Sequence, residues 1–304
     1  MTLETKVARL EKAEAQRHSR SFWRDAVGFI RRDRLTVFAI GVLLLLTLVC
    51  SLSPIVLERV FALEVNKINV PDKFKLPGEG GFVLGADQLG RDQLLRLIYG
   101  GRVSLTIAYL ASVMTVTIGV ALGLLAGYYG KAVDDLISWG VNTLSAIPPL
   151  FLLLIAAAVW EPSTEVLVFM LAALGWVGTS RLVRGEVLSL KERDYVLAAR
   201  ASGASDWRIL VIHILPNVFP IVMVTMTIIA GNLILTESGL SYLGMGIQPP
   251  TPTWGNMLTD SRSYLVTGVH LIVMPGILIM ITVLCFYLVG DGLRDALDPR
   301  RYQQ

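Results

Sequence analysis

The sequence predicts an all-α, polytopic membrane protein with six transmembrane helices. Of its 304 residues, 54% are apolar and 17% are charged, and the mean hydropathy is +0.61. Soluble domains average about 45–50% apolar and about 25% charged residues. Long stretches without Asp, Glu, Lys or Arg recur along the chain. Because lipid offers no partner to backbone polar groups, each stretch that is long enough to cross a bilayer is expected to be a helix.

Five uncharged stretches predict spans directly: 35–57, 103–130, 136–160, 209–236 and 263–290. The first would reach about 34 Å at about 1.5 Å per residue, which exceeds a hydrocarbon core of about 30 Å. A sixth stretch, 166–180, is marginal alone. Arg181 and Arg184 follow it, and their side chains can reach the headgroups while Leu182 and Val183 extend the apolar segment. The total is six spans.

Basic residues near the spans predict the orientation. Residues 1–34 contain nine Lys and Arg, the segment 181–212 contains six and the tail 291–304 contains three. Since Lys and Arg concentrate in cytoplasmic loops, both termini are predicted to be cytoplasmic. The loop 58–102 is then external although it has seven basic and six acidic residues. Long loops cross the membrane largely regardless of charge, so this loop does not reverse the topology.

The chain therefore divides into a cytoplasmic tail with an interfacial helix (1–34), a first transmembrane helix (35–57), an external loop (58–102), a transmembrane core of five helices (103–290) and a cytoplasmic tail (291–304). In the first tail, Phe22, Trp23, Phe29 and Ile30 recur at helical spacing among arginines. This pattern is typical of a helix that lies among headgroups, which makes membrane lipid a predicted partner. A basic flank that only sets topology is a compatible interpretation.

The cytoplasmic segment 187–208 is too elaborate for a simple connector. Small side chains make one face of a predicted helix nearly flat, and that face contains Tyr195, Ala198, Ala199 and Ser202. Gly203 is expected to end the helix because glycine adopts the left-handed conformation of a C-terminal cap, and Ser205 with Asp206 can begin the next helix. Such a face can dock on a partner. An amphipathic helix resting on lipid is the alternative that the pattern leaves open.

Prolines and glycines within the spans have structural and mechanistic interpretations. Pro148, Pro149 and Pro275 are either hinges or static kinks. The fifth span is expected to kink at Pro216 and Pro220. Glycines four residues apart in the second span permit close helix approach, and packing is their favoured use; they are Gly119, Gly123 and Gly127.

Charged residues near the predicted external side also have two interpretations each. Glu237 either meets a substrate amine or is a solvated or loop-capping carboxylate, and we favour the second interpretation. Asp87, Arg91 and Asp92 either gate the external mouth or fix the outer loop through charge pairs. The sequence alone does not separate these two.

Several classes of function are disfavoured. A net charge of +3 without a clustered basic face argues against a nucleic-acid partner. His18, His213 and His270 are scattered, and Cys50 and Cys285 lie in apolar runs, so no metal site is expected. The chain has no His-Glu-x-x-His, no Gly-x-Ser-x-Gly and no phosphate-binding Gly-x-x-x-x-Gly-Lys-Ser/Thr. An enzyme, and a bound nucleotide, are therefore not expected in this chain.

Three segments together resemble a known family, the membrane subunits of bacterial ATP-binding-cassette (ABC) importers. Their cytoplasmic loop follows the pattern Glu-Ala-Ala, three residues, Gly, nine residues, then Ile, any residue, Leu, Pro. Here Leu197 and His213 replace the Glu and the Ile, and the positions in register are Ala198, Ala199, Gly203, Leu215 and Pro216. Residues 84–92 and 242–258 resemble signatures of the dipeptide/oligopeptide/nickel permease subfamily, in its C-type subunit.

The resemblance implies a type I ABC importer permease fold in the bacterial cytoplasmic membrane. It implies ATP-driven import of peptides or related solutes by alternating access, together with a homologous permease subunit, two cytoplasmic ATP-binding subunits and an external solute-binding protein. ATP and Mg would be bound by those ATPases, and this chain would hold no cofactor. The implied ATPase-coupling interface consists of Asp194, Tyr195, Ala198, Ala199, Gly203, Ala204, Leu215 and Pro216. An ion-coupled secondary transporter, which needs ionisable groups inside the spans, is the alternative.

Overall fold

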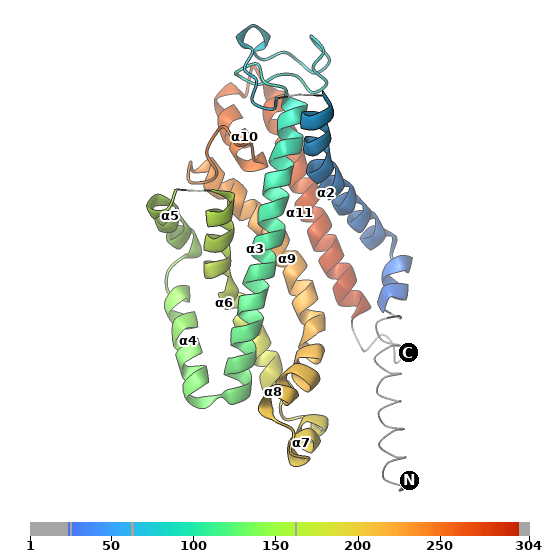
Figure 1. The fold of residues 1–304 in the computed structure, drawn as a ribbon, viewed down its shortest axis with the longest axis vertical. Helices are drawn as coiled ribbons and strands as arrows, with labels where there is room; N and C mark the ends of the chain where they lie inside the picture. The colour runs from blue at the N-terminus through green and yellow to red at the C-terminus, as the bar shows by residue number, and fades with distance from the viewer. Residues whose placement is uncertain (1–23, 25, 62–63, 162, 298–304) are drawn as a thin grey trace.

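The computed structural model describes residues 24, 26–61, 64–161 and 163–297. These residues form an elongated bundle of long helices, and no β-strand occurs among them (Figure 1). Five helical segments of this described part are long and apolar enough to cross a membrane: Arg34–Pro54, Gln93–Tyr129, Thr164–Leu190, Asp206–Tyr242 and Val269–Ala296. A sixth crossing results if the bent pair Lys131–Ser145 and Pro149–Val159 is one span. The all-α polytopic class predicted from the sequence is confirmed.

The first long helix, α2 (Arg34–Phe61), extends beyond both predicted ends, and the second, α3 (Gln93–Tyr129), begins well before its predicted start. The external loop predicted at 58–102 therefore ends at Asp92, whose side chain accepts a hydrogen bond from the Leu95 amide and caps α3. Arg96 is part of the predicted loop but lies within α3, where its side chain is buried and forms ion pairs. Placing the start of this helix directly after the charged residue Arg102 therefore puts it too late in the sequence. The predicted interfacial helix begins at Phe22 and Trp23, which lie outside the described residues.

The predicted third span, 136–160, is broken into two helices. α4 (Lys131–Ser145) and α5 (Pro149–Val159) meet at an angle of 83°. Pro149 disfavours helical backbone in the residue before it, and Pro148 is accordingly extended with φ −57° and ψ 130°. Neither proline has an N–H to continue the hydrogen bonds of α4. The span predicted at 136–160 is therefore sharply bent at the two prolines for which a hinge or a kink is predicted.

The fourth span, α6 (Thr164–Leu190), is longer than the uncharged stretch that predicted it. Arg184 makes two hydrogen bonds to Asp134 of α4, at 2.6 and 2.5 Å, and Arg181 donates to Ser145 at 2.8 Å. Both arginines were predicted to reach lipid headgroups. Both bond to side chains of α4, which face them across the α4–α6 contact.

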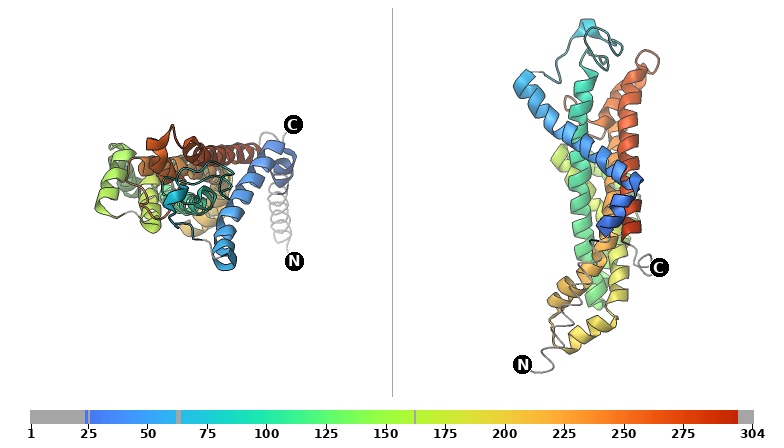
Figure 2. Two further views of the ribbon diagram at one scale, coloured as in Figure 1. Left: turned by 90° about the horizontal axis from the view of Figure 1, so that it is seen from above. Right: turned by 90° about the vertical axis from the view of Figure 1, so that its right-hand side faces the viewer.

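The remaining helices place the connecting segments at opposite ends of the bundle. α7 (Asp194–Ala201) and α8 (Asp206–Arg208) lie at one end, while the loop 64–92 and α10 (Trp254–Ser261) lie at the other (Figure 1). α9 (Leu215–Tyr242) and α11 (Val269–Ala296) run between the two ends. α2 lies obliquely across α3 and α11, as the side view in Figure 2 shows. The loop predicted to be cytoplasmic and the loops predicted to be external therefore lie at opposite ends of the bundle, as expected.

Close contact between α3 and α6 forms the centre of the bundle. A Cβ atom at Gly119 would lie 2.5 Å from the Thr179 Cβ, and one at Gly123 or Gly127 would lie 2.7 Å from a valine Cβ of α6. Only glycine lets the two backbones approach this closely. The packing interpretation of this glycine row is confirmed.

Candidate functional site

The segment after α6 forms the predicted helix, turn and second helix. α7 ends at Ala201, and Gly203 follows it with φ +80°, the left-handed conformation expected of a helix terminus. The Ser205 side chain then accepts a hydrogen bond from the Arg208 amide and caps α8. We call residues 194–208 the loop tip, which is the outermost part of this end of the bundle in Figure 1.

The candidate interface residues lie in two environments, exposed and half-buried. Asp194, Tyr195, Ala198 and Gly203 are exposed, with 41% of Tyr195 accessible. Ala199 and Ala204 are half-buried and pack on a core cluster that includes the fully buried Val196. Leu215 is half-buried and Pro216 is exposed where α9 begins. The predicted flat face is thus smaller than expected, because Ala199 faces the protein.

Polar contacts join the loop tip to α3. The Tyr128 hydroxyl of α3 donates a hydrogen bond to Asp206 at 2.6 Å, and the Arg200 guanidinium lies 5.6 Å from the centre of the Tyr128 ring. Lys191, at the end of α6, donates to the Gly127 carbonyl at 3.1 Å. The loop tip is therefore fixed to two membrane helices as well as to α9, which continues from it.

A π-helical turn, Ile209–Ile214, connects α8 to α9. Residues five apart stack in a π turn, so Ile209 and Ile214 both enter the core cluster together with Val218. The π turn ends just before Pro216, one of the two prolines at which a kink is predicted, enters the first turn of α9. The Asn217 side-chain amide bonds to the His213 carbonyl at 2.7 Å.

Large exposed apolar side chains surround the exposed face of α7. Leu197, at the position of the family's glutamate, is 47% exposed, and Trp207 is 71% exposed. Ile212 in the π turn is also exposed. Sequence reasoning missed Trp207 and assigned Ile212 to a membrane span. An apolar surface of this kind at a polar loop marks a site of interaction.

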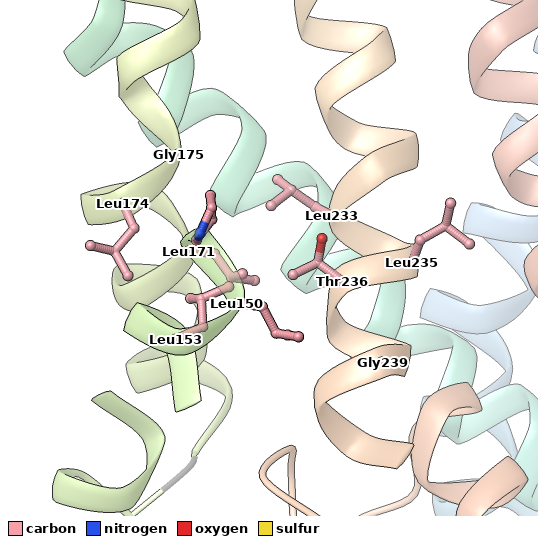
Figure 3. A pocket seen from close by; sticks show the side chains of 10 residues that line it. Leu150, Leu153, Leu171, Leu174, Gly175, Leu233, Leu235, Thr236 and Gly239 are labelled. Carbon is pink, nitrogen blue, oxygen red and sulfur yellow. The ribbon is translucent and has the colours of Figure 1, made fainter. Parts of the chain in front are cut away.

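A hollow lies within the bundle, between α5, α6 and α9 (Figure 3). Its volume is about 430 Å³, and its lining residues are Pro149, Leu150, Leu153, Leu171, Leu174, Gly175, Leu233, Leu235, Thr236 and Gly239. The Thr236 hydroxyl is the one polar side-chain group among them. The lining is therefore almost entirely apolar and holds no charged side chain.

At the opposite end, buried ion pairs fix the external loop. Asp87 contacts Arg91 at 2.6 Å and Arg96 at 3.4 Å, and Asp260 of α10 contacts these arginines at 3.9 and 3.6 Å. Burial raises the pKa of the Asp260 carboxyl, and the two arginines oppose that shift. These contacts join the loop, α3 and α10. Fixing the loop is therefore the role that the geometry supports for Asp87 and Arg91.

Glu237 is only 1% exposed, which contradicts a solvated carboxylate. Its carboxyl group accepts hydrogen bonds from Ser241 at 2.9 Å, Thr253 at 2.8 Å and Ser104 at 3.5 Å. Thr253 precedes α10 and caps it, so Glu237 contacts this loop through the hydroxyl of the capping residue and does not itself cap the helix. The contribution of Ser104 could not be predicted, because Ser104 lies on α3, far from Glu237 in the sequence.

The histidines and cysteines contribute no metal site within the described ranges, where no group of three or more His, Cys, Asp or Glu side chains is placed to hold a metal ion. Cys50 and Cys285 are buried as free thiols. His18 lies outside the described residues.

Long apolar helices around an internal hollow, with an exposed loop tip fixed to three of them, define a multi-pass membrane permease. Comparison with known proteins gives the family. Residues 119–302 match the family described as "Binding-protein-dependent transport system inner membrane component", and the chain belongs to it. This assignment confirms the resemblance inferred from the loop motif and favours the ATP-driven permease over the ion-coupled alternative.

Curated relatives match over nearly the whole chain. A dipeptide transport system permease protein of Alkalihalophilus pseudofirmus is 36% identical over 279 residues, 91% of this chain and 90% of the relative. An oligopeptide transport system permease protein of Bacillus subtilis is 35% identical over 282 residues, 93% and 91% of the two chains. A glutathione transport system permease protein of Pectobacterium atrosepticum is 42% identical over 217 residues, 71% and 72%.

A solved structure confirms the fold. An inward-facing structure of the MetNI methionine ABC transporter matches with a TM-score of 0.54 at 19% identity. The match covers 67% of this chain and 97% of that chain. The fold is therefore that of an ABC importer permease.

Proposed function

We propose that the chain is a permease subunit that imports short peptides through a bacterial cytoplasmic membrane, with both termini cytoplasmic. The peptide-transport names of its relatives support this substrate class. A homologous permease subunit would complete the path, two cytoplasmic ATPases would bind ATP and Mg, and an external solute-binding protein would deliver the peptide. This chain itself would hold no catalytic residue and no cofactor.

The loop tip carries the proposal. Its exposed residues form the face that an ATPase cleft would cover, while Ala199, Ala204 and the Tyr128–Asp206 hydrogen bond transmit movement to the bundle. Closure of the ATPases on ATP would favour one state of the permease pair because it moves the docked α7. Alternating access to the hollow between α5, α6 and α9 follows from that shift.

Replacing Ala198 with tryptophan tests the docking face. Ala198 is exposed on α7, so the larger side chain is expected to obstruct the ATPase cleft without disturbing the core. We expect peptide-stimulated ATP hydrolysis of the purified complex to fall at least about tenfold, which corresponds to about 1.4 kcal/mol. The same change at Gly203 would also strain the positive φ, and at Ala199 it would disturb packing, so neither is as clear a test.

Ala132→Trp is the matched control, because Ala132 is an exposed alanine of α4 at the same end of the bundle. It should retain more than half of the wild-type turnover, and both variants should keep the thermal midpoint of the wild type. Wild-type turnover in the Ala198→Trp complex would contradict docking at α7.

The substrate class has a separate test. The external binding protein selects the solute, so mass spectrometry of what the cognate binding protein retains from a mixture identifies it. We expect di- or oligopeptides, and uptake of a labelled peptide that depends on this chain. Retention of a nickel chelate or an oligosaccharide instead would leave the permease assignment intact and refute the peptide proposal.

A further inference from the structure

A groove near the loop-tip end of the bundle belongs to neither the docking face nor the internal hollow. It lies between α6, α9 and the end of α11 and has a volume of about 430 Å³. Its lining residues are Leu182, Pro220, Ile221, Val224, Thr225, Arg294 and Leu297. Five of these side chains are apolar, and the one charge among them is that of Arg294.

The groove lies where the apolar parts of its helices give way to charge. On α11 no Asp, Glu, Lys or Arg occurs from Val269 until Asp291, and Arg294 follows one turn later. On α6, Leu182 lies between Arg181 and Arg184, which end the uncharged stretch of that helix. Positions one turn beyond an apolar span lie at the level of the lipid headgroups. The apolar lining is therefore next to acyl chains and Arg294 is next to phosphate groups.

Arg294 differs from the arginines packed inside the bundle. Arg91, Arg96 and Arg184 each form an ion pair with an aspartate. Arg294 is exposed and forms no ion pair with any residue of the described ranges, although Asp291 and Asp295 are on the same helix. Its guanidinium is free to bind an anion at the mouth of the groove.

A segment that leads into two further arginines packs beside the groove. Ile30, from the short helical segment before α2, packs in one cluster with Val224 and Leu297, and both of these residues also line the groove. Arg31 and Arg32 follow Ile30 and are exposed. The groove therefore combines an apolar trough with a basic rim.

We propose that this groove binds an anionic phospholipid from the leaflet on the loop-tip side, with its phosphate on Arg294 and an acyl chain along Pro220, Ile221 and Val224. A soluble phosphate would gain nothing from the trough. A zwitterionic lipid would gain less from the basic rim. Under the proposed orientation this leaflet is the cytoplasmic one, and basic pockets between transmembrane helices on that side suit anionic headgroups.

Native mass spectrometry of the assembled transporter, purified with its partner chains, tests the proposal. The probes are phosphatidylglycerol and phosphatidylcholine with identical acyl chains. The wild type should retain at least about five times more phosphatidylglycerol than phosphatidylcholine, a preference worth about 1 kcal/mol by the tenfold-per-1.4 kcal/mol rule. Arg294→Gln should remove that preference, Arg294→Lys should keep most of it, and Val224→Phe should reduce retention of both lipids because it fills the trough.

Arg262→Gln is the matched control, because Arg262 is an exposed arginine at the opposite end of the bundle. It should leave phosphatidylglycerol retention unchanged. Equal retention of the two lipids by the wild type, or full preference in the Arg294→Gln complex, would overturn the proposal. Displacement of the lipid by glycerol phosphate would assign a soluble ligand instead. Lipid that binds the isolated chain but is lost on assembly would show that a partner protein covers the groove, and the proposal would fail.

Discussion

Replacing Gly123 with valine is expected to lower the free energy of unfolding by about 1–3 kcal/mol, the usual cost of overpacking. A Cβ atom at this position would lie 2.7 Å from the Ser180 carbonyl oxygen and 2.7 Å from the Val183 Cβ. The backbone oxygen cannot turn aside, and the rest of α3 is held to α6 by the same contacts at Gly119 and Gly127. The two helices must therefore separate. Thermal unfolding in detergent, followed by size-exclusion chromatography, measures the loss.

Gly178→Val provides the control for this prediction. Gly178 is an exposed glycine of α6, and a Cβ atom there would have no neighbour within 4 Å. The substitution should change stability by no more than about 0.5 kcal/mol, as is usual for surface positions. An equal loss in both variants would show that α3 and α6 tolerate a wider separation than their backbone contacts indicate.

The long helices and the loop tip could be predicted because their signals are local. An uncharged stretch is enough to place a span, and Gly203 with Ser205 is enough to place the turn after α7. The ends of the helices could not be read in the same way. Arg96 and Arg184 lie outside the uncharged stretches 103–130 and 166–180 but inside the helices, and each has an aspartate partner elsewhere in the sequence.

The break between α4 and α5 shows a further limit. Pro148 and Pro149 predicted a hinge or a kink, and the structure contains a turn of 83°. Proline removes hydrogen bonds and disfavours the helical region before it, but it does not fix the direction of the next helix. That direction depends on how α5 packs on α6, through contacts such as Leu153 in the cluster that also contains Leu167. Such contacts are not visible in a single sequence.

The external network around Glu237 was the least accessible to sequence reasoning. Its members come from α3, α9 and the start of α10, and the hydroxyl donors Ser104 and Thr253 are ordinary residues in their own segments. A carboxylate near the end of a span is solvated by default, so the sequence favoured a solvated or capping role. Only the fold of α10 back against α3, which buries Trp254 completely, reveals that water is excluded there.

Glu237→Leu is expected to lower the free energy of unfolding by at least about 2 kcal/mol and to release α10 from the bundle. The substitution removes the acceptor of Ser241 and Thr253, and a buried polar group without a partner costs about 1–3 kcal/mol. Thr253 also caps α10 by accepting from the Asn256 amide, and Ser104 accepts from the Trp254 amide. Both contacts depend on hydroxyls that Glu237 orients.

Glu237→Gln separates this positioning role from a simple need for a bulky side chain. Glutamine keeps a carbonyl oxygen where the Ser241 and Thr253 hydroxyls donate, so its stability should lie within about 1 kcal/mol of the wild type. Hydrogen exchange over residues 254–261 is the decisive measurement: it should accelerate in the leucine variant and remain slow in the glutamine variant, with α6 as the internal reference. Slow exchange over 254–261 in the leucine variant would mean that Trp254, whose indole donates to the Leu97 carbonyl at 2.9 Å, holds α10 without the carboxylate.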